Sequence, residues 1–305
     1  NENEINPIIY NCTFTQNEAQ SGGAIFYPDG TTNGDEDKII YNCTFESNIA
    51  SHEGSCIYSL TFNLTLRNVT FKNNRPESEC NTFLYIRMNE NPPTIDEVIF
   101  ESNDGCTFSI DVPDNTLVFT NCIFRNSKGQ IFNSKKILGD EPRKFIDCTF
   151  TLNEGNDATT PINLLNKVYI FERCNFSYNK KGTIEVSGDS KATFEDCVFE
   201  YNEIGTDGGA IRFFSSQPLT VYNSRFNGNK ATNFGGAIYA DGQGKSEVVY
   251  NISDCQFQNC EAKEGTFIYS KSYLLKLFYS TFEQNAKNDY IYIEMGKNKP
   301  DIDNC

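Results

Sequence analysis

One phenylalanine recurs inside the same short polar phrase along the whole chain, seen most plainly as Asn-Cys-Thr-Phe-Glu-Ser-Asn at residues 42 to 48. The phrase returns at intervals of 23 to 31 residues. Self-similarity at this period is typical of a solenoid, in which each repeat buries its apolar face by stacking on its neighbours. The recurring residues are Phe14, Phe45, Phe71, Phe100, Phe124, Phe150, Phe176, Phe199, Phe226, Phe257 and Phe282.

Aligning the repeats on this phenylalanine turns the sequence into columns. The residue five positions before it is apolar in every repeat, and the residue two before it is cysteine in seven repeats. The residue three before it is Asn or Asp in eight of the eleven repeats, and the residue three after it is Asn in nine. The polar columns are typical of corners, because Asn and Asp tolerate left-handed backbone and hydrogen-bond locally.

The spacing of the apolar columns predicts short strands joined by bends. The phenylalanine and the residue two before it share one strand face. In a continuous strand, the apolar residue five before it would lie on the opposite face. A bend must therefore lie between them, at the Asn or Asp column. A third short apolar stretch follows the second Asn corner, and it is clearest in Gly-Gly-Ala-Ile at 22 to 25, 208 to 211 and 235 to 238.

Short strands stacked turn on turn predict an all-β fold, a right-handed single-stranded parallel β-helix of about 11 to 12 turns. Like residues then stack into a Phe ladder, a Cys ladder and Asn ladders, and buried corner amides can hydrogen-bond the turns above and below. A leucine-rich repeat is the alternative fold, since its period overlaps. It fits worse, because Phe replaces the leucines and no repeat contains a helical pattern.

Composition and charge predict an extracellular protein. Length alone suggests two domains, but the unbroken repeat predicts one domain over 1–305, a fragment of a longer repeat protein that stops within a repeat at Cys305. The net charge of −15 argues against nucleic acid as a partner, and no apolar run is long enough to span a membrane. We expect a secreted or cell-surface protein.

The chain has 12 cysteines and one histidine, His52, which argues against the usual Cys/His zinc sites. We expect the ladder cysteines to be small buried hydrophobes. Cys56, Cys80 and Cys106 fall outside the ladder in three consecutive turns. A disulfide from Cys80 to Cys106, or from Cys56 to Cys80, is therefore open.

Six Asn-x-Ser/Thr triplets are candidate glycosylation sites. Three of them begin at strand positions that the repeat phase directs outward, and these rank first: Asn63, Asn175 and Asn251. The other three occupy the corner column, where the amide has a competing internal role: Asn11, Asn42 and Asn68.

The alternation of Phe-x-x-Asn (at 14 to 17, 199 to 202 and 226 to 229) with the three Gly-Gly-Ala-Ile segments resembles the repeat of the polymorphic outer membrane protein family. That family is known from bacterial autotransporter adhesins, and similar repeats occur in surface proteins of parasitic protists. The resemblance covers essentially the whole chain and implies an adhesive function. Residues 54 to 57, Gly-Ser-Cys-Ile, are a drifted copy.

Candidate catalytic chemistry is sparse. His52 lies in a polar loop, and no phosphate-binding loop, Gly-x-Ser-x-Gly or His-Glu-x-x-His motif occurs. Acids that directly follow a ladder Phe align down one side of the predicted helix, as a solvated face does. These acids are Glu46, Glu101, Glu200 and Glu283. The acidic loop 29–37 could hold calcium but lacks the bidentate Glu of an EF-hand, so we expect neither a metal nor a cofactor.

These observations predict a non-enzymatic scaffold that displays loops for cell adhesion or extracellular assembly. The predicted contact surface includes the insertions 28–38, 86–94, 154–160 and 240–247. The predicted partners are a host or neighbouring cell-surface glycan or protein, or other copies associating end to end through unpaired strand edges. The alternative is a polysaccharide lyase or glycoside hydrolase on the same fold, which would need a cleft with converging carboxylates or Arg.

Overall fold

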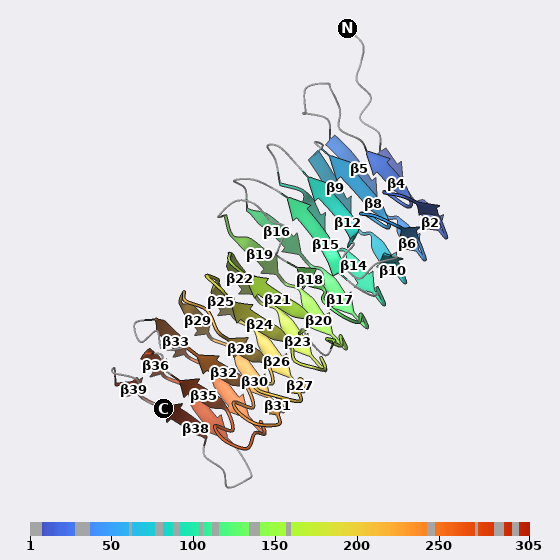
Figure 1. Cartoon of the computed structure of the whole chain (residues 1–305). Coiled ribbons are helices and arrows are strands. Elements are labelled where there is room, and N and C mark those ends of the chain that lie inside the picture. The colour runs from blue at the N-terminus through green and yellow to red at the C-terminus, as the bar shows by residue number, and fades with distance from the viewer. Residues whose placement is uncertain are drawn as a thin grey trace. The chain divides into compact units, whose positions relative to one another are not determined.

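The structure is a computed structural model that describes residues 8–27, 37–60, 63–76, 82–87, 92–103, 106–111, 116–133, 141–156, 160–242, 248–271, 274–283, 290–294 and 299–305. The chain forms two compact units, Asn1–Cys148 and Thr149–Cys305, and strands dominate both (Figure 1). Nothing in this division tests the single domain expected from the repeat, which stays a prediction. The described segments include no helix with the length and hydropathy needed to cross a bilayer.

Each turn of unit 1 passes through three sheets, here named A, B and C in chain order. Sheet A contains β1 (Ile8–Tyr10), β5 (Asp37–Tyr41), β9 (Asn63–Arg67), β13 (Thr94–Asp96), β16 (Leu117–Thr120) and β19 (Arg143–Ile146). Sheet B contains β2 (Thr13–Thr15), β6 (Thr44–Glu46), β10 (Thr70–Lys72), β14 (Ile99–Glu101) and β17 (Ile123–Arg125). Sheet C contains β4 (Ile25–Tyr27), β8 (Ile57–Leu60), β12 (Thr82–Arg87) and β15 (Cys106–Asp111). Three short strands follow the B strands and pair together, β3 (Glu18–Ala19), β7 (Ile49–Ala50) and β11 (Arg75–Pro76), and β18 (Phe132–Asn133) follows β17 in the chain.

Unit 2 repeats this plan. Sheet A contains β22 (Val168–Glu172), β25 (Lys191–Glu195), β29 (Leu219–Tyr222), β33 (Val249–Ser253), β36 (Leu274–Phe278) and β39 (Asp301–Asp303). Sheet B contains β20 (Thr149–Thr151), β23 (Asn175–Ser177), β26 (Val198–Glu200), β30 (Arg225–Asn227), β34 (Gln256–Gln258) and β37 (Thr281–Glu283). Sheet C contains β21 (Ile162–Leu165), β24 (Ile184–Ser187), β28 (Ile211–Phe213), β32 (Ile238–Asp241), β35 (Ile268–Lys271) and β38 (Ile291–Glu294). The short strands β27 (Glu203–Ile204) and β31 (Lys230–Ala231) pair with each other.

Neighbouring turns pair in parallel and place like residues together, as the repeat predicts. Phe45 and Phe71 are register partners, and so are Phe71 and Phe100. Their rings stack with centroids 5.0 and 5.4 Å apart, and all three side chains are buried. In unit 2 the Phe199 and Phe226 rings stack at 4.6 Å. The parallel β-helix and its Phe ladder are therefore confirmed within each unit.

Two left-handed residues bracket each B strand from β2 to β34. One is the predicted corner, three residues before the ladder Phe, as at Asn42 with φ 54°. The second lies two residues after the Phe, as at Ser47 with φ 57°, and not at the Asn one position further on. The second bend therefore lies one residue earlier than the sequence indicates, and it turns the following Asn side chain inward.

The inward Asn column forms the buried amide ladder. The backbone N–H and the Nδ2 of Asn48 donate to Oδ1 of Asn74 at 2.9 and 3.1 Å, and the same Nδ2 donates to the carbonyl of Phe14 at 3.0 Å. Asn48 and Asn74 are fully buried. Each amide thus satisfies backbone groups that the bend leaves unpaired.

The Gly-Gly-Ala-Ile corner needs both glycines for separate reasons. Gly208 has φ +72°, which L side chains rarely adopt. A Cβ on Gly209 would lie 2.2 Å from the carbonyl oxygen of Gly236 in the next turn, so the close stacking of turns excludes a side chain there.

The ladder cysteines behave as buried polar-tipped hydrophobes. Each cysteine whose side chain the structure describes is a free thiol, and most are buried. The Cys122 Sγ, for example, donates to the carbonyls of Thr120 at 3.2 Å and Ile95 at 3.7 Å. Burial raises the pKa of the Cys255 thiol to about 12. The Cys255 thiol is therefore protonated and a poor nucleophile at neutral pH.

Candidate interaction surface

The acids that follow the ladder Phe lie outward, as predicted, and several pair with neighbouring turns. The Glu101 carboxylate lies 3.1 Å from the Arg125 guanidinium, and the Glu200 carboxylate lies 3.7 Å from that of Arg225. Glu283 accepts a hydrogen bond of 3.0 Å from Gln258. Glu46 occupies the same outward column in register with Lys72. Glu101, Glu200 and Glu283 therefore link successive turns on the surface of sheet B.

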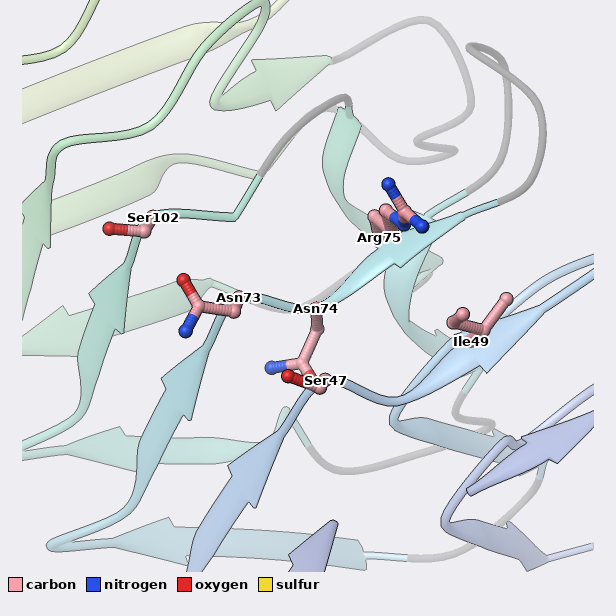
Figure 2. Close-up of a pocket in the computed structure, with 6 residues that line it drawn as sticks. All are labelled: Ser47, Ile49, Asn73, Asn74, Arg75 and Ser102. Atoms are coloured by element: carbon pink, nitrogen blue, oxygen red, sulfur yellow. The ribbon is translucent and has the colours of Figure 1, made fainter. Parts of the chain in front are cut away.

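A shallow hollow of about 280 Å³ lies at the second corner in unit 1. Figure 2 shows Ser47, Asn73 and Ser102 at the ends of three neighbouring B strands, with Ile49 and Arg75 on the adjoining short strands β7 and β11. The exposed Arg75 guanidinium and the small polar corner residues can hydrogen-bond a polar group. None of the described residues that line the hollow is an acid or a histidine.

The structure reverses the exposure expected of the glycosylation triplets. Asn11, Asn42 and Asn68 at the first corner are exposed, and their side-chain amides bond to one another, with Asn42 Nδ2 donating to Asn11 Oδ1 and Asn68 Nδ2 to Asn42 Oδ1, each at 3.1 Å. The left-handed residue turns its own side chain outward, so the internal role expected for these amides belongs to the other Asn column. The strand residues Asn63, Asn175 and Asn251 are only partly exposed. Their use as glycan acceptors stays a prediction.

Cys56 is buried in the turn that follows Gly54-Ser55, and its thiol is free. Burial raises its pKa well above the ordinary value. Cys80 lies outside the described residues, as does the side chain of Cys106. The free Cys56 thiol rules out a Cys56 to Cys80 disulfide in this structure, whereas a Cys80 to Cys106 disulfide stays a prediction.

Several other predicted features lie partly or wholly outside the described residues. Of the acidic loop 29–37 only the backbone at residue 37 is described, and residues 28–36, 88–91, 157–159 and 243–247 of the four insertions are not. His52 is exposed, and its backbone N–H donates to the carbonyl of Gln20 at 2.8 Å. Over the described ranges no three His, Cys, Asp or Glu side chains gather as a metal site would require.

A cluster that sequence reasoning missed lies at the second corner of unit 2. The left-handed position two residues after the ladder Phe is filled elsewhere mainly by small or polar residues, which tolerate this backbone, such as Ser47, Asn73 and Gly228. In three consecutive turns it carries bulky apolar residues instead, with φ of 55°, 55° and 53°. We name these three residues the corner ridge: Leu152, Tyr178 and Tyr201.

The corner ridge combines exposure with backbone strain. Leu152, Tyr178 and Tyr201 are 54%, 51% and 47% exposed. The two tyrosine rings stack with centroids 5.2 Å apart, and Asn227 Nδ2 donates to the Tyr201 hydroxyl at 3.4 Å. A left-handed backbone costs roughly 1–2 kcal/mol for a residue of this kind. Strain of this kind gathers at functional sites. The departure from Asn, Ser and Gly in one column is the signal that could have identified the ridge from sequence.

A second exposed aromatic stack lies on sheet A of unit 1. Tyr10 and Tyr41 are 57% and 39% exposed, and their rings stack at 5.3 Å. They directly precede the exposed corner residues Asn11 and Asn42. Both units therefore present rigid aromatic pairs to solvent beside hydrogen-bonding amides.

Parallel single-strand turns, left-handed corners and an internal amide ladder define the class as the parallel β-helices. The family model described as a right-handed β-helix region matches residues 1–157 and 137–305, so the chain belongs to this family. The hand of the coil predicted from sequence is thereby confirmed.

Two solved structures show similarity over most of the chain. One is QnrB1, a plasmid-mediated fluoroquinolone resistance protein, at 9% identity and a TM-score of 0.25, covering 94% of this chain and 92% of that one. The other is the A-module of the mannuronan C-5 epimerase AlgE6 of Azotobacter vinelandii, at 10% identity and a TM-score of 0.29, covering 97% of this chain and 90% of that one. Such low scores carry no argument about function. No curated protein matches the sequence.

Proposed function

We propose that this protein is a non-enzymatic, extracellular or cell-surface scaffold whose rigid turns display side chains for adhesion or assembly. The observation that carries the proposal is the exposure of stacked aromatic residues on the outside of both units, at Tyr10 and Tyr41 and at the corner ridge. Tyrosine contributes large contact area at low entropic cost and is enriched at the centres of interfaces. A β-helix holds such residues at fixed spacing, so little ordering remains to oppose binding.

The resemblance to the polymorphic outer membrane protein repeat supports the adhesive part of this proposal. The pairing of outward acids with bases on neighbouring turns supports the non-enzymatic part, because Glu101 and Glu200 hold surface ion pairs. A secreted or cell-surface location accords with the acidic, Asn-rich and Thr-rich composition. The partner in adhesion would be a surface glycan or protein that contacts the exposed aromatic residues.

Binding of the purified protein to cells and to a glycan array tests the proposal. We expect binding that falls when Tyr10 and Tyr41 are both changed to Ser, because the stacked aromatic surface is lost. Gln258→Ala removes a surface hydrogen bond on another sheet and serves as the matched control. Incubation with a panel of polysaccharides tests the alternative, since turnover of any of them by the wild-type protein contradicts a scaffold.

A further inference from the structure

The surface beside the corner ridge is a column of alternating charges on unit 2. In four successive turns, the residue four positions after the ladder Phe lies just past the second bend and points outward. The backbones of these four residues pair in register. We name these four residues the charge column: Glu154, Lys180, Glu203 and Lys230. The column continues to Glu261, whose carboxylate lies 3.1 Å from the Lys230 ammonium and raises the pKa of that group.

The ridge and the charge column are complementary to themselves when one copy is reversed. Neighbouring turns are about 4.8 Å apart, so the residues of both columns lie at equal steps. A two-fold axis that lies in the contact plane, between the turns of Tyr178 and Tyr201, reverses the order of the turns and keeps each column facing itself. Lys180 then faces Glu203 of the second copy, and Glu154 faces Lys230 of the second copy.

The same operation matches the shapes along the ridge. Tyr178 faces Tyr201 of the second copy, so the four exposed rings meet at the axis. Leu152 faces Gly228 of the second copy, where the absence of a side chain leaves room for that copy's own Tyr201 ring. The bulky side chains of the ridge therefore meet one another.

Other alignments of the two copies are worse. An axis through the turn of Tyr178 places Lys180 against itself and Glu154 against Glu203, and an axis through the turn of Tyr201 places Lys180 against Lys230. Like charges placed opposite each other suppress such pairings. An axis one turn further toward the C-terminus pairs unlike charges but places Tyr178 against Asn259, so it loses the aromatic contact.

We propose that the corner ridge and the charge column form an antiparallel, two-fold contact between two copies of this chain. The contact explains why a strained corner carries exposed Leu and Tyr where Asn, Ser or Gly would be less costly. Three apolar side chains from each copy make a small interface, so the contact belongs to the weak, concentration-dependent class. The inference names a partner for the assembly part of the proposed function and rests on the proposed function in that respect alone.

Sedimentation equilibrium from micromolar to millimolar protein tests the contact. We expect a monomer–dimer equilibrium in the wild-type chain. The double variant Tyr178→Asn/Tyr201→Asn should raise the dissociation constant by at least about tenfold, since aromatic anchors at the centre of a contact dominate its free energy. Asn tolerates the left-handed backbone, so the variant should be at least as stable to heat as the wild type, and its loss of association is not unfolding.

The matched control is Tyr279→Asn. Tyr279 is a 60% exposed tyrosine with φ 50° at the other corner of unit 2. This substitution relieves the same kind of strain on another face and should leave the dissociation constant unchanged.

A charge exchange separates contacts between copies from contacts within one copy. Lys180→Glu should weaken association, because the new carboxylate would face Glu203 of the second copy. Adding Glu203→Lys should restore association, because opposite charges face each other again. Within one chain the single and the double exchange each create two like-charged neighbours, so relief of repulsion within a chain does not account for restored association. Restoration is therefore the signature of the two-fold contact.

A strict monomer at all concentrations overturns the proposal, as does association that ignores the ridge substitutions. Specific glycan binding by a monomer, lost in Tyr178→Asn/Tyr201→Asn, would assign the ridge to a glycan instead. If the protein is a monomer that still binds cells, the two-fold contact is contradicted and the scaffold function stands. If it is a dimer that degrades a polysaccharide, the scaffold function is contradicted and the two-fold contact stands.

Discussion

Asn202 donates two hydrogen bonds to the same amide oxygen of Asn229. Its backbone N–H and its Nδ2 both donate to Oδ1 of Asn229, at 3.2 and 2.9 Å. The Nδ2 of Asn202 also donates to the carbonyl of Phe176 at 2.9 Å. One side chain thereby ties three successive turns of unit 2 together in the buried interior.

Replacing Asn202 with Ala should lower the free energy of unfolding by about 3 kcal/mol. The backbone N–H and Nδ2 of Asn179 would lose their shared acceptor in a buried position, and such groups cost about 1–3 kcal/mol each when unsatisfied. Urea denaturation measures the change. Gln258→Ala is the control, with an expected effect below about 0.5 kcal/mol, because it removes only a surface hydrogen bond. Equal effects of the two variants would contradict an energetic role for the ladder.

Extending the ladder at Cys260 should stabilise the protein. Cys260 stands where the repeat has Asn, and Asn229 Nδ2 reaches its Sγ at only 4.0 Å. Cys260→Asn supplies an amide oxygen for Asn229 and an amide donor for the Phe226 carbonyl, and we expect a gain of about 1 kcal/mol in urea denaturation. Cys260→Ser removes the thiol without adding the amide and should give no such gain.

The second glycine of the Gly-Gly corner should tolerate no side chain. Gly209→Ala places a Cβ against the carbonyl oxygen of Gly236, and separating the stacked turns should cost about 3 kcal/mol or prevent folding. Gly205 lies in the same turn with nothing within 4 Å of its Cβ position, so Gly205→Ala should be neutral or slightly stabilising. Thermal melting of the two variants compares them directly, and similar melting temperatures would rule out the steric explanation.

Left-handed corners filled by ordinary residues are sites for stabilisation. Glu97 is exposed at the first corner of unit 1 with φ 55°. Glu97→Asn should raise the free energy of unfolding by roughly 0.5 to 1 kcal/mol, because Asn visits this conformation at lower cost. Glu97→Ala changes the charge in the same way without suiting the backbone, so a gain shared by both variants would point to charge rather than conformation.

Stability should fall at alkaline pH. Burial raises the pKa of the Cys255 and Cys260 thiols to about 12, from an ordinary value of 9.0. Between these values the unfolded chain has released protons that the folded chain retains, so the folded state loses stability as pH rises. The contribution is fully present well below pH 9, and the loss reaches about 1 kcal/mol per thiol near pH 10.

Urea denaturation from neutral to alkaline pH measures this slope. Cys255→Val combined with Cys260→Asn should flatten it, since Val fills the same ladder column at Val69 and Val98. Cys12→Val removes an exposed thiol and serves as the control. An unchanged slope in the double variant would assign the alkaline loss to other groups.

The sequence by itself determined the repeat, the turn-on-turn stacking and the first corner. Phe45, Phe71 and Phe100 recur in one register, and only stacking of parallel turns buries such a column. The bend before each of them followed from the alternation of side chains along a strand. The residue five positions before the Phe can face inward together with the Phe only if a bend lies between them. These features depend on local spacing, which the order of residues contains directly.

Only the tertiary structure decided which polar column lies inside. A left-handed residue reverses the in-and-out alternation, so moving the second bend from Asn48 to Ser47 turns the Asn48 amide inward, whereas the first bend turns the Asn42 amide outward. The partners of Glu101 and Asn202 come from neighbouring turns, at sequence distances that vary from turn to turn. The corner ridge, likewise, exists because Leu152, Tyr178 and Tyr201 meet across turns that only the stacked coil brings together.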